Sequence, residues 1–221
     1  MTPPEINVPI GSILSALGLV GIFVFAASGA LAAARLRQTL VTFAFFAITT
    51  GVGGGTVRDL LIGAPVFWIH DVWPALICLG AALLVWITPV HWWSARALDW
   101  LDAICLVAFA VFGTAKAMSL GIHPFISALM GISTACVGGI IRDLLAGEPS
   151  IVLGPEIYVT AAALAAGVYA LLLSIGLSPP AAAVIAVVAG FALRAIAILR
   201  GLALPSYRER SAGGQAGGPS A

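Results

Sequence analysis

Seven long apolar runs follow one another along the chain and leave room for little else. They cover residues 10–34, 39–57, 72–90, 103–120, 125–141, 157–175 and 181–199. A helix needs about 20 apolar residues to cross the roughly 30 Å hydrocarbon core of a bilayer, and these runs match that length. Charged residues make up only 9% of the chain, against about 25% in soluble domains. The sequence therefore predicts an all-α integral membrane protein with seven transmembrane helices.

A sequence repeat divides the first six runs into two sets of three. GGTVRDLLIGAP at residues 54–65 returns 84 residues later as GGIIRDLLAGEP at residues 138–149. At the same offset Phe25 matches Phe109. Because three is odd, the second copy must enter the membrane upside down, as in other inverted-repeat membrane proteins. The predicted units are a first three-helix repeat at residues 10–90, an inverted second repeat at 98–175, a seventh helix at 181–200 and a flexible cytoplasmic tail at 201–221.

Basic residues are unevenly shared between the two sides of the predicted bundle. One side carries Arg58 and Lys116, and the other carries Arg35, Arg37, Arg96, Arg142, Arg200, Arg208 and Arg210. Because lysine and arginine concentrate in cytoplasmic loops, we expect the C-terminus in the cytoplasm and the N-terminus outside, in the cell inner membrane. The net charge of +1 provides no basic face for nucleic acid.

Glycines crowd the ends of the second and fifth predicted helices, next to hydroxyl side chains. The two clusters are Thr49, Thr50, Gly53, Gly54 and Gly55 in the first repeat, and Ser133, Thr134, Gly138 and Gly139 in the second. Each glycine costs a helix roughly 1 kcal/mol relative to alanine, so several together are expected to bend or unwind it. Carbonyls freed in this way, with the hydroxyls, would coordinate a cation. The alternative is close helix packing, which small residues also allow, but the duplication favours a permeation path.

Each glycine cluster is followed by an arginine and an aspartate, Arg58–Asp59 and Arg142–Asp143. Interfacial anchoring explains one arginine at a helix end but not the same string twice on opposite faces. Adjacent residues on a helix point about 100° apart, so we expect each charge to bind another helix rather than its neighbour. The expected pairs are Asp59 with Lys116, and Arg142 with Asp99 or Asp102.

Two further charges lie inside apolar runs. Lys116 has Ala32 at the equivalent position of the first repeat. It is either a helix-end anchor or a cation that faces the pathway and senses the membrane potential, where a full traverse is worth about 2.3 kcal/mol per 100 mV. Arg194 lies near the cytoplasmic end of the last run, and we expect its side chain to snorkel to the headgroups.

The sequence offers no basis for catalysis, a cofactor or a metal site. The three histidines fall in separate predicted loops, and the three cysteines stand singly in apolar runs, where buried inert thiols are expected. No Ser-His-Asp, HExxH or P-loop pattern is present. Permeant potassium or sodium is the only expected ion.

The doubled GGxxRDLLxGxP string, in two three-helix repeats followed by a seventh helix, resembles the prokaryotic relatives of the trimeric intracellular cation channels. The resemblance covers roughly residues 10 to 200, and this family's prokaryotic domain has also been labelled a glycine transporter. It implies a homotrimer in which each subunit holds its own pore for monovalent cations, chiefly potassium. It also implies that helices two and five kink at Gly53–Gly55 and at Gly138 and Gly139 and line that pore. Lys116 is the nearest match to basic residues linked to gating in animal members, whose Lys-Glu-Val signature and second basic residue are absent.

Passive cation conduction is therefore the leading functional hypothesis, with monovalent cations and membrane lipids as partners. Arg58 and Arg142 would repel cations from either mouth unless carboxylates neutralise them or they act as gates. The alternative is a secondary transporter of a small zwitterion such as glycine, because inverted repeats also serve alternating access. A structural or assembly role is the third reading.

Overall fold

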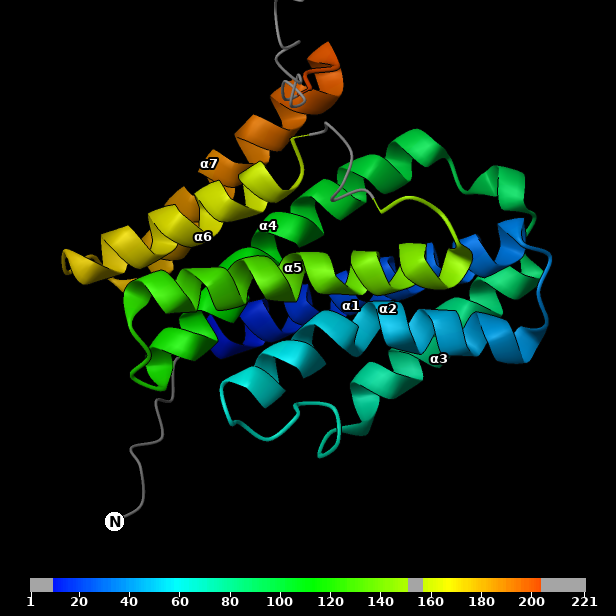
Figure 1. Ribbon diagram of the computed structural model, residues 1–221, viewed down its shortest axis with the longest axis horizontal. Coiled ribbons are helices and arrows are strands. Elements are labelled where there is room, and N and C mark those ends of the chain that lie inside the picture. The colour runs from blue at the N-terminus through cyan, green and yellow to red at the C-terminus, as the bar shows by residue number, and fades with distance from the viewer. Residues whose placement is uncertain (1–9, 151–156, 204–221) are drawn as a thin grey trace, which may run out of the picture.

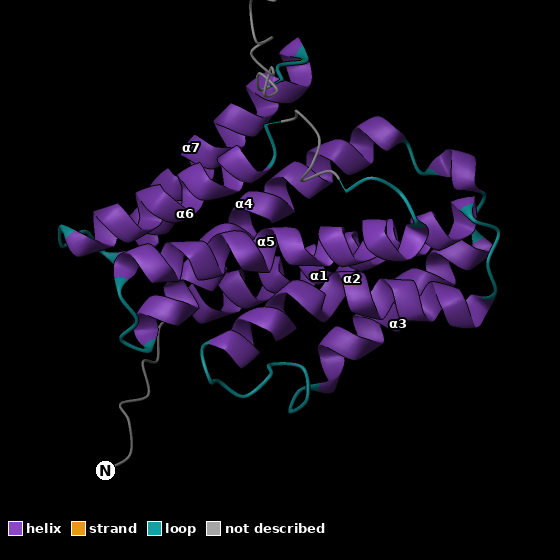
Figure 2. Ribbon diagram, viewed as in Figure 1, coloured by secondary structure: helices purple, strands orange, loops and turns teal. Residues whose placement is uncertain are grey.

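The computed structural model describes residues 10–150 and 157–203, so most of the predicted tail lies outside the described residues. Within them the protein is helical throughout, with no β-strand element (Figure 2). The elements are α1 (Ile10–Arg35), α2 (Leu40–Leu61), α3 (Val72–Ile87), the 3-10 turn η1 (Val90–Trp92), α4 (Ala95–Ser119), α5 (Pro124–Ala146), α6 (Val159–Ser174) and α7 (Pro179–Arg200). The prediction of seven α-helices is confirmed for this part of the chain.

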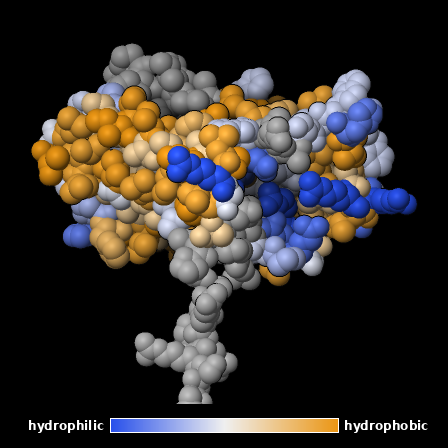
Figure 3. All heavy atoms as spheres, turned by 90° about the horizontal axis from the view of Figure 1, so that it is seen from above, coloured by the Kyte–Doolittle hydropathy of each residue, from blue (hydrophilic) through white to orange (hydrophobic). Residues whose placement is uncertain are grey.

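The helices differ in how far they reach. Among the described helices, α1, α2, α4, α5 and α7 are long and apolar enough to cross a membrane. The third helix of each repeat, α3 or α6, has 16 residues and spans only about 24 Å at 1.5 Å per residue. Figure 3 shows apolar side chains over most of one face of the molecule, with hydrophilic ones gathered toward the right half of the view. This surface suits lipid, as the composition predicts.

The two glycine-rich helices extend further than expected. The uncharged runs end at residues 57 and 141, whereas α2 continues to Leu61 and α5 to Ala146. Each helix ends next to a glycine in the left-handed region, Gly63 at φ +67° and Gly147 at φ +69°, a conformation that favours glycine. The Arg-Asp pairs therefore belong to the last helical turns, and the glycine clusters lie about two turns inside each helix.

Equivalent helices of the two repeats run in opposite directions and touch. The colour gradient of Figure 1 shows α2 and α5 antiparallel. Gly54 lies directly against the Thr134 carbonyl oxygen, and Gly138 lies against the Thr50 carbonyl oxygen. A residue pair that is related by the repeat and also in contact must lie near the pseudo-twofold axis. These reciprocal contacts therefore place that axis at the α2–α5 crossing.

The glycines act here by allowing close packing. Both α2 and α5 keep α-helical backbone through their clusters, so the expectation that the glycines unwind these helices is wrong. A side chain at Gly54 or Gly138 would overlap the backbone of the other helix. The packing of α2 against α5 thus offsets the low helix propensity of glycine. No carbonyls are freed at the clusters, and a bend there stays a prediction.

The core divides along the repeats. One buried apolar cluster lies in α1, α2 and α3 and another in α4, α5, α6 and α7. A small third cluster of Val24, Phe25 and Cys105, with Phe109 packed on it, lies between α1 and α4. Buried cysteines are confirmed at all three positions.

Candidate functional site

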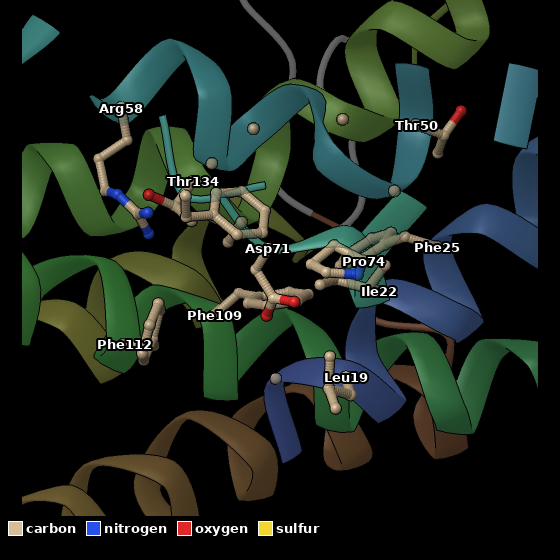
Figure 4. A pocket seen from close by; sticks show the side chains of 17 residues that line it. Leu19, Ile22, Phe25, Thr50, Arg58, Asp71, Pro74, Phe109, Phe112 and Thr134 are labelled. Atoms are coloured by element: carbon tan, nitrogen blue, oxygen red, sulfur yellow. The ribbon is translucent and has the colours of Figure 1, made fainter. Parts of the chain in front are cut away.

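A cavity of about 200 Å3 lies beside the α2–α5 crossing (Figure 4). Its walls come from α1, α2, α4 and α5 and from the start of α3. Arg58 and Phe112 lie on one side of it, and Ile22 and Phe25 lie on the other. We call this space the Arg58-side cavity. Of the predicted pore residues, it is lined by Thr50, Gly54, Gly55, Thr134 and Gly138.

A second cavity of about 180 Å3 lies near the opposite end of the α2–α5 pair, and we call it the Arg142-side cavity. Its charged wall contrasts with the largely apolar wall of the first. The ionisable residues that line it are Arg35, Asp99, Asp102, Arg142, Asp143, Glu148, Tyr158 and Arg194. The arginine of each Arg-Asp string thus lines a different cavity, Arg58 the first and Arg142 the second, as the inverted arrangement requires.

The first Arg-Asp pair forms a buried charge cluster with Lys116. Arg58 Nε donates to Asp59 Oδ1 at 2.8 Å, and Arg58 Nη2 lies 2.7 Å from the same oxygen. Lys116 Nζ also donates to this oxygen at 2.7 Å, while the Phe67 amide donates to Oδ2 at 3.0 Å. Asp59 is fully buried and Arg58 is 1% exposed. We call these three charged residues the Asp59 cluster.

The Asp59 cluster confirms one expectation and corrects another. Asp59 does pair with Lys116, so this lysine binds a carboxylate on α2 instead of anchoring to headgroups. The expectation that Arg58 and Asp59 do not satisfy one another is wrong. An arginine side chain is long enough for its planar guanidinium to fold back onto the neighbouring carboxylate, although the two Cβ atoms diverge.

The second Arg-Asp pair repeats this geometry with a different third partner. Arg142 Nε donates to Asp143 Oδ1 at 2.8 Å, and Nη1 donates to Ser28 Oγ at 3.1 Å. At the other end the Arg58 guanidinium lies over the Phe112 ring, 5.4 Å from its centroid. Ser28 and Phe112 are 84 residues apart, so the two arginines contact equivalent positions of α1 and α4.

The expected partners of Arg142 lie nearby without forming its ion pair. Its salt bridge is with Asp143, whereas Asp99 and Asp102 line the same cavity. Tyr158 and Arg194 line this cavity beside them. The direct pairing of Arg142 with Asp99 or Asp102 is thus replaced by a pairing within α5.

Arg194 does not snorkel. Its side chain is 6% exposed, and its guanidinium lies 5.2 Å from the centroid of the Tyr158 ring. Nη1 donates to the Ile157 carbonyl oxygen at 3.3 Å. A ring face and a carbonyl oxygen hold the cation inside the protein, so it does not reach the headgroups. Through Arg194, α7 contributes a charge to the Arg142-side cavity, although it lies outside the repeat.

The hydroxyls near the glycines play unequal parts. Thr49 Oγ1 donates to Phe45 O at 2.8 Å and Thr134 Oγ1 donates to Met130 O at 2.7 Å, within their own helices. Thr50 Oγ1 is buried and finds no partner among the described residues. Four of the predicted pore residues line neither cavity: Thr49, Gly53, Ser133 and Gly139. Of the predicted charged residues, Asp59 and Lys116 line neither cavity.

Sequence reasoning missed the aromatic residues of the site. Phe25, Phe109 and Phe112 line the Arg58-side cavity, and Tyr158 lines the other. The identity of Phe25 with its repeat mate Phe109 is the signal in the sequence that points to these rings. Among the described residues no group of histidine, cysteine or acidic side chains is placed to hold a metal ion.

Comparison with known proteins agrees with this geometry. The family model described as glycine transporter matches twice, at residues 15–89 and 99–174. A UPF0126 membrane protein of Vibrio cholerae is 37% identical over 202 residues, covering 89% of this chain and 83% of the relative. The UPF0126 inner membrane protein YadS of Escherichia coli is 36% identical over 158 residues, covering 66% of this chain and 72% of YadS.

Solved structures extend the likeness to the fold. A TRIC trimeric intracellular cation channel orthologue from Rhodobacter sphaeroides superposes with a TM-score of 0.81 at 39% identity, covering 86% of this chain and all of that one. A second solved structure, which describes the structural basis for conductance through TRIC cation channels, superposes with a TM-score of 0.83 at 27% identity. The match covers 90% of this chain and 98% of that one. The solved relatives are channels and not enzymes. Together with the double match of the family model, these similarities show that the chain belongs to the TRIC cation channel family.

Proposed function

We propose that the protein is a potassium-preferring monovalent cation channel whose conducting path runs inside each subunit. One observation carries the proposal: the two cavities lie at opposite ends of the α2–α5 pair within a single chain. A path that joins them would pass through the protomer rather than between protomers. The solved relatives are known as TRIC cation channels, which supports the ion class.

The charges at the Arg58 end fit a regulated path better than a permanently open one. Asp59 binds both Arg58 and Lys116, so one carboxylate neutralises part of two positive charges. The same contacts tie α2 to α4 beside the Arg58-side cavity. Breaking the Lys116–Asp59 contact would loosen α4 from α2 at this end and leave the contact of Arg58 with the Phe112 ring. The repulsion of cations by Arg58 is thus reduced. In this proposal Lys116 is the member of the Asp59 cluster that moves when the path opens.

Transport of glycine is the second candidate, because the matching family model carries that description. Paired cavities and inverted repeats also suit alternating access. Against this candidate, α2 and α5 are continuous helices, so neither offers a helix N-terminus in mid-membrane to a substrate carboxylate. The Arg58 guanidinium is already engaged by Asp59. The contacts therefore favour conduction.

The deciding experiment uses purified protein in liposomes. We expect potassium flux that does not saturate, exceeds sodium flux and is indifferent to added glycine. Radiolabelled glycine uptake that saturates and depends on an ion gradient would replace conduction with the transporter. Liposomes that pass neither ion nor glycine would contradict both candidates.

Replacing Lys116 with methionine is expected to raise basal potassium flux. The change removes the contact between α4 and Asp59 and leaves the Arg58–Asp59 pair in place. Because the lysine side chain is 26% exposed, we assign its pair about 1 kcal/mol, or about a fivefold shift in the ratio of open to closed channels. Single-channel recordings measure this ratio directly, and potassium flux into liposomes should rise with it.

Lys116→Arg is the matched control, because arginine keeps the charge and reaches the same carboxylate. We expect its flux to stay near that of the unchanged protein, and the ratio of potassium to sodium flux to stay the same in both variants. A methionine variant whose open probability is unaltered, or which alters only ion preference, would remove the lysine from gating.

The assembly and its orientation are part of the same proposal. The word trimeric in the description of the Rhodobacter sphaeroides relative supports a homotrimer with three separate paths. The inner membrane location of YadS supports placement in the cell inner membrane. With Arg35 and Arg142 at one cavity and the positive-inside rule, we place the Arg142-side cavity toward the cytoplasm. The repeats at residues 10–90 and 98–175 then act as the two halves of each path.

A further inference from the structure

The Arg58-side cavity has one charged residue of each sign in its wall. Among the described residues that line it, Arg58 is the only basic one and Asp71 is the only acidic one. The Arg142-side cavity differs, because four acidic side chains line it. The electrostatic character of the Arg58-side cavity therefore depends on a single carboxylate.

The positive charge of Arg58 is only partly neutralised by its partner. Arg58 and Lys116 share the one carboxylate of Asp59, so the Asp59 cluster keeps a formal charge of +1. Of the three members of this cluster, only Arg58 lines the cavity. Its guanidinium would repel a cation on the proposed path. A path for cations therefore needs a second carboxylate on this side, and Asp71 is the one that lines the cavity.

Asp71 reaches the cavity because of where the third helix of the repeat begins. It is the N-cap residue of α3, as Tyr158 is the N-cap residue of α6. Each of these residues lines the cavity on its own side. Figure 4 shows the Asp71 carboxylate among the labelled side chains, between Arg58 and Leu19 in the view. At this equivalent position the first repeat thus supplies a carboxylate and the second a phenol.

Capping of α3 leaves the charge of Asp71 available. Its Oδ1 accepts a hydrogen bond from the Trp73 amide at 3.1 Å, and within residues 10–150 and 157–203 no basic side chain forms an ion pair with it. The residue is exposed, so its charge acts on ions in water. A cap needs only a hydrogen-bond acceptor, and asparagine serves as well as aspartate. Helix capping alone therefore does not require a charge at this position.

We propose that Asp71 is the residue that makes the Arg58-side cavity attract cations and reject anions. The inference rests on the proposed conduction function. The carboxylate offsets the excess positive charge of the Asp59 cluster and raises the local concentration of permeant cations, as charged clefts do. This attraction acts through water, so its reach follows the Debye length, about 30 Å at about 0.01 M salt and about 3 Å at about 1 M. Asp71 sets which ions enter and how many, whereas Lys116 sets how often the path is open.

Asp71→Asn removes the charge and keeps the cap. We expect the single-channel potassium conductance of the reconstituted protein to fall about threefold at about 10 mM KCl, where a unit charge is weakly screened, and to stay unchanged at about 1 M. The reversal potential in a KCl gradient should shift toward that of chloride. Asp71→Glu is the matched control, because it keeps the charge, and it should conduct like the unchanged protein at both salt concentrations.

Asp71→Cys allows the sign of the charge to be set after folding. A thiosulfonate reagent that carries a sulfonate puts a negative charge at residue 71, and one that carries a trimethylammonium group puts a positive charge there. We expect the first to restore the low-salt conductance and the second to lower it further. Cys78, Cys105 and Cys136 are buried, so the unchanged protein should respond to neither reagent. Because both reagents act on folded protein, a folding defect cannot produce opposite effects.

The outcomes separate this inference from the proposed function. If the unchanged protein passes no potassium at either salt concentration, the proposed function fails and the inference fails with it. If the unchanged protein conducts and folded Asp71→Asn matches it at low salt, the inference alone is overturned. A loss of conductance that is equal at low and high salt, or that responds alike to both reagents, would leave Asp71 as a helix cap only.

Discussion

Purified Gly138→Ala protein is expected to unfold at a lower temperature than the unchanged protein, and Gly54→Ala should behave alike. A methyl group at either position overlaps a carbonyl oxygen of the opposite helix, and backbone cannot rotate away as a side chain can. Overpacking costs up to about 3 kcal/mol, of which alanine recovers about 1 kcal/mol through its helix propensity. The net loss of about 2 kcal/mol corresponds to a drop of roughly 6 °C for a chain of this size. Thermal unfolding in detergent, followed by size-exclusion chromatography, measures it.

Gly139→Ala is the control one residue away. A Cβ at Gly139 would find nothing nearer than 3.9 Å, so alanine should leave the unfolding temperature unchanged or raise it slightly. The pair of variants also tests the predicted kink. If Gly138 and Gly139 act by making α5 flexible, both alanine variants should reduce potassium flux to the same extent. If packing is what matters, only the Gly138 variant should be impaired.

Asp59→Asn is expected to destabilise the protein more than any other single charge removal in either Arg-Asp string. The change leaves Arg58 and Lys116 without their shared carboxylate, and Arg58 is almost fully enclosed. Breaking a buried ion pair by removing one partner costs about 3–5 kcal/mol. We therefore expect a fall of roughly 10 °C in unfolding temperature for a chain of this length, or little folded protein at all. Yield of monodisperse protein and its thermal unfolding check both outcomes.

Asp143→Asn is the repeat-matched comparison. The Asp143 and Arg142 side chains are 8% and 18% exposed, and Arg142 keeps its bond to Ser28, so the loss should be smaller. Adding Lys116→Met to Asp59→Asn removes one of the two stranded cations and should restore part of the stability. Equal destabilisation by the Asp59 and Asp143 substitutions would contradict the burial argument.

The Arg-Asp strings show where sequence reasoning succeeds and fails at this site. The Asp59–Lys116 contact could be predicted, because the side of the membrane on which each charge falls follows from counting spans. The Arg58–Asp59 contact was excluded by helix geometry at the Cβ atoms, and the long arginine side chain overrides that geometry. The direction in which Arg194 points depends on Tyr158 and the Ile157 carbonyl, which no local pattern reveals.

The sequence by itself determined that the protein lies in lipid, that it is helical and that it contains a duplication. Lipid preference is a sum over many apolar side chains, and the orientation of the repeats follows from their odd number of spans. Only the tertiary structure decided what the duplicated residues do. Gly54 and Gly138 looked like helix breakers until each was found against a carbonyl of the other helix. The physical reason is that the effect of a glycine depends on the atoms that surround it, and here those atoms belong to the other repeat, far away in the chain.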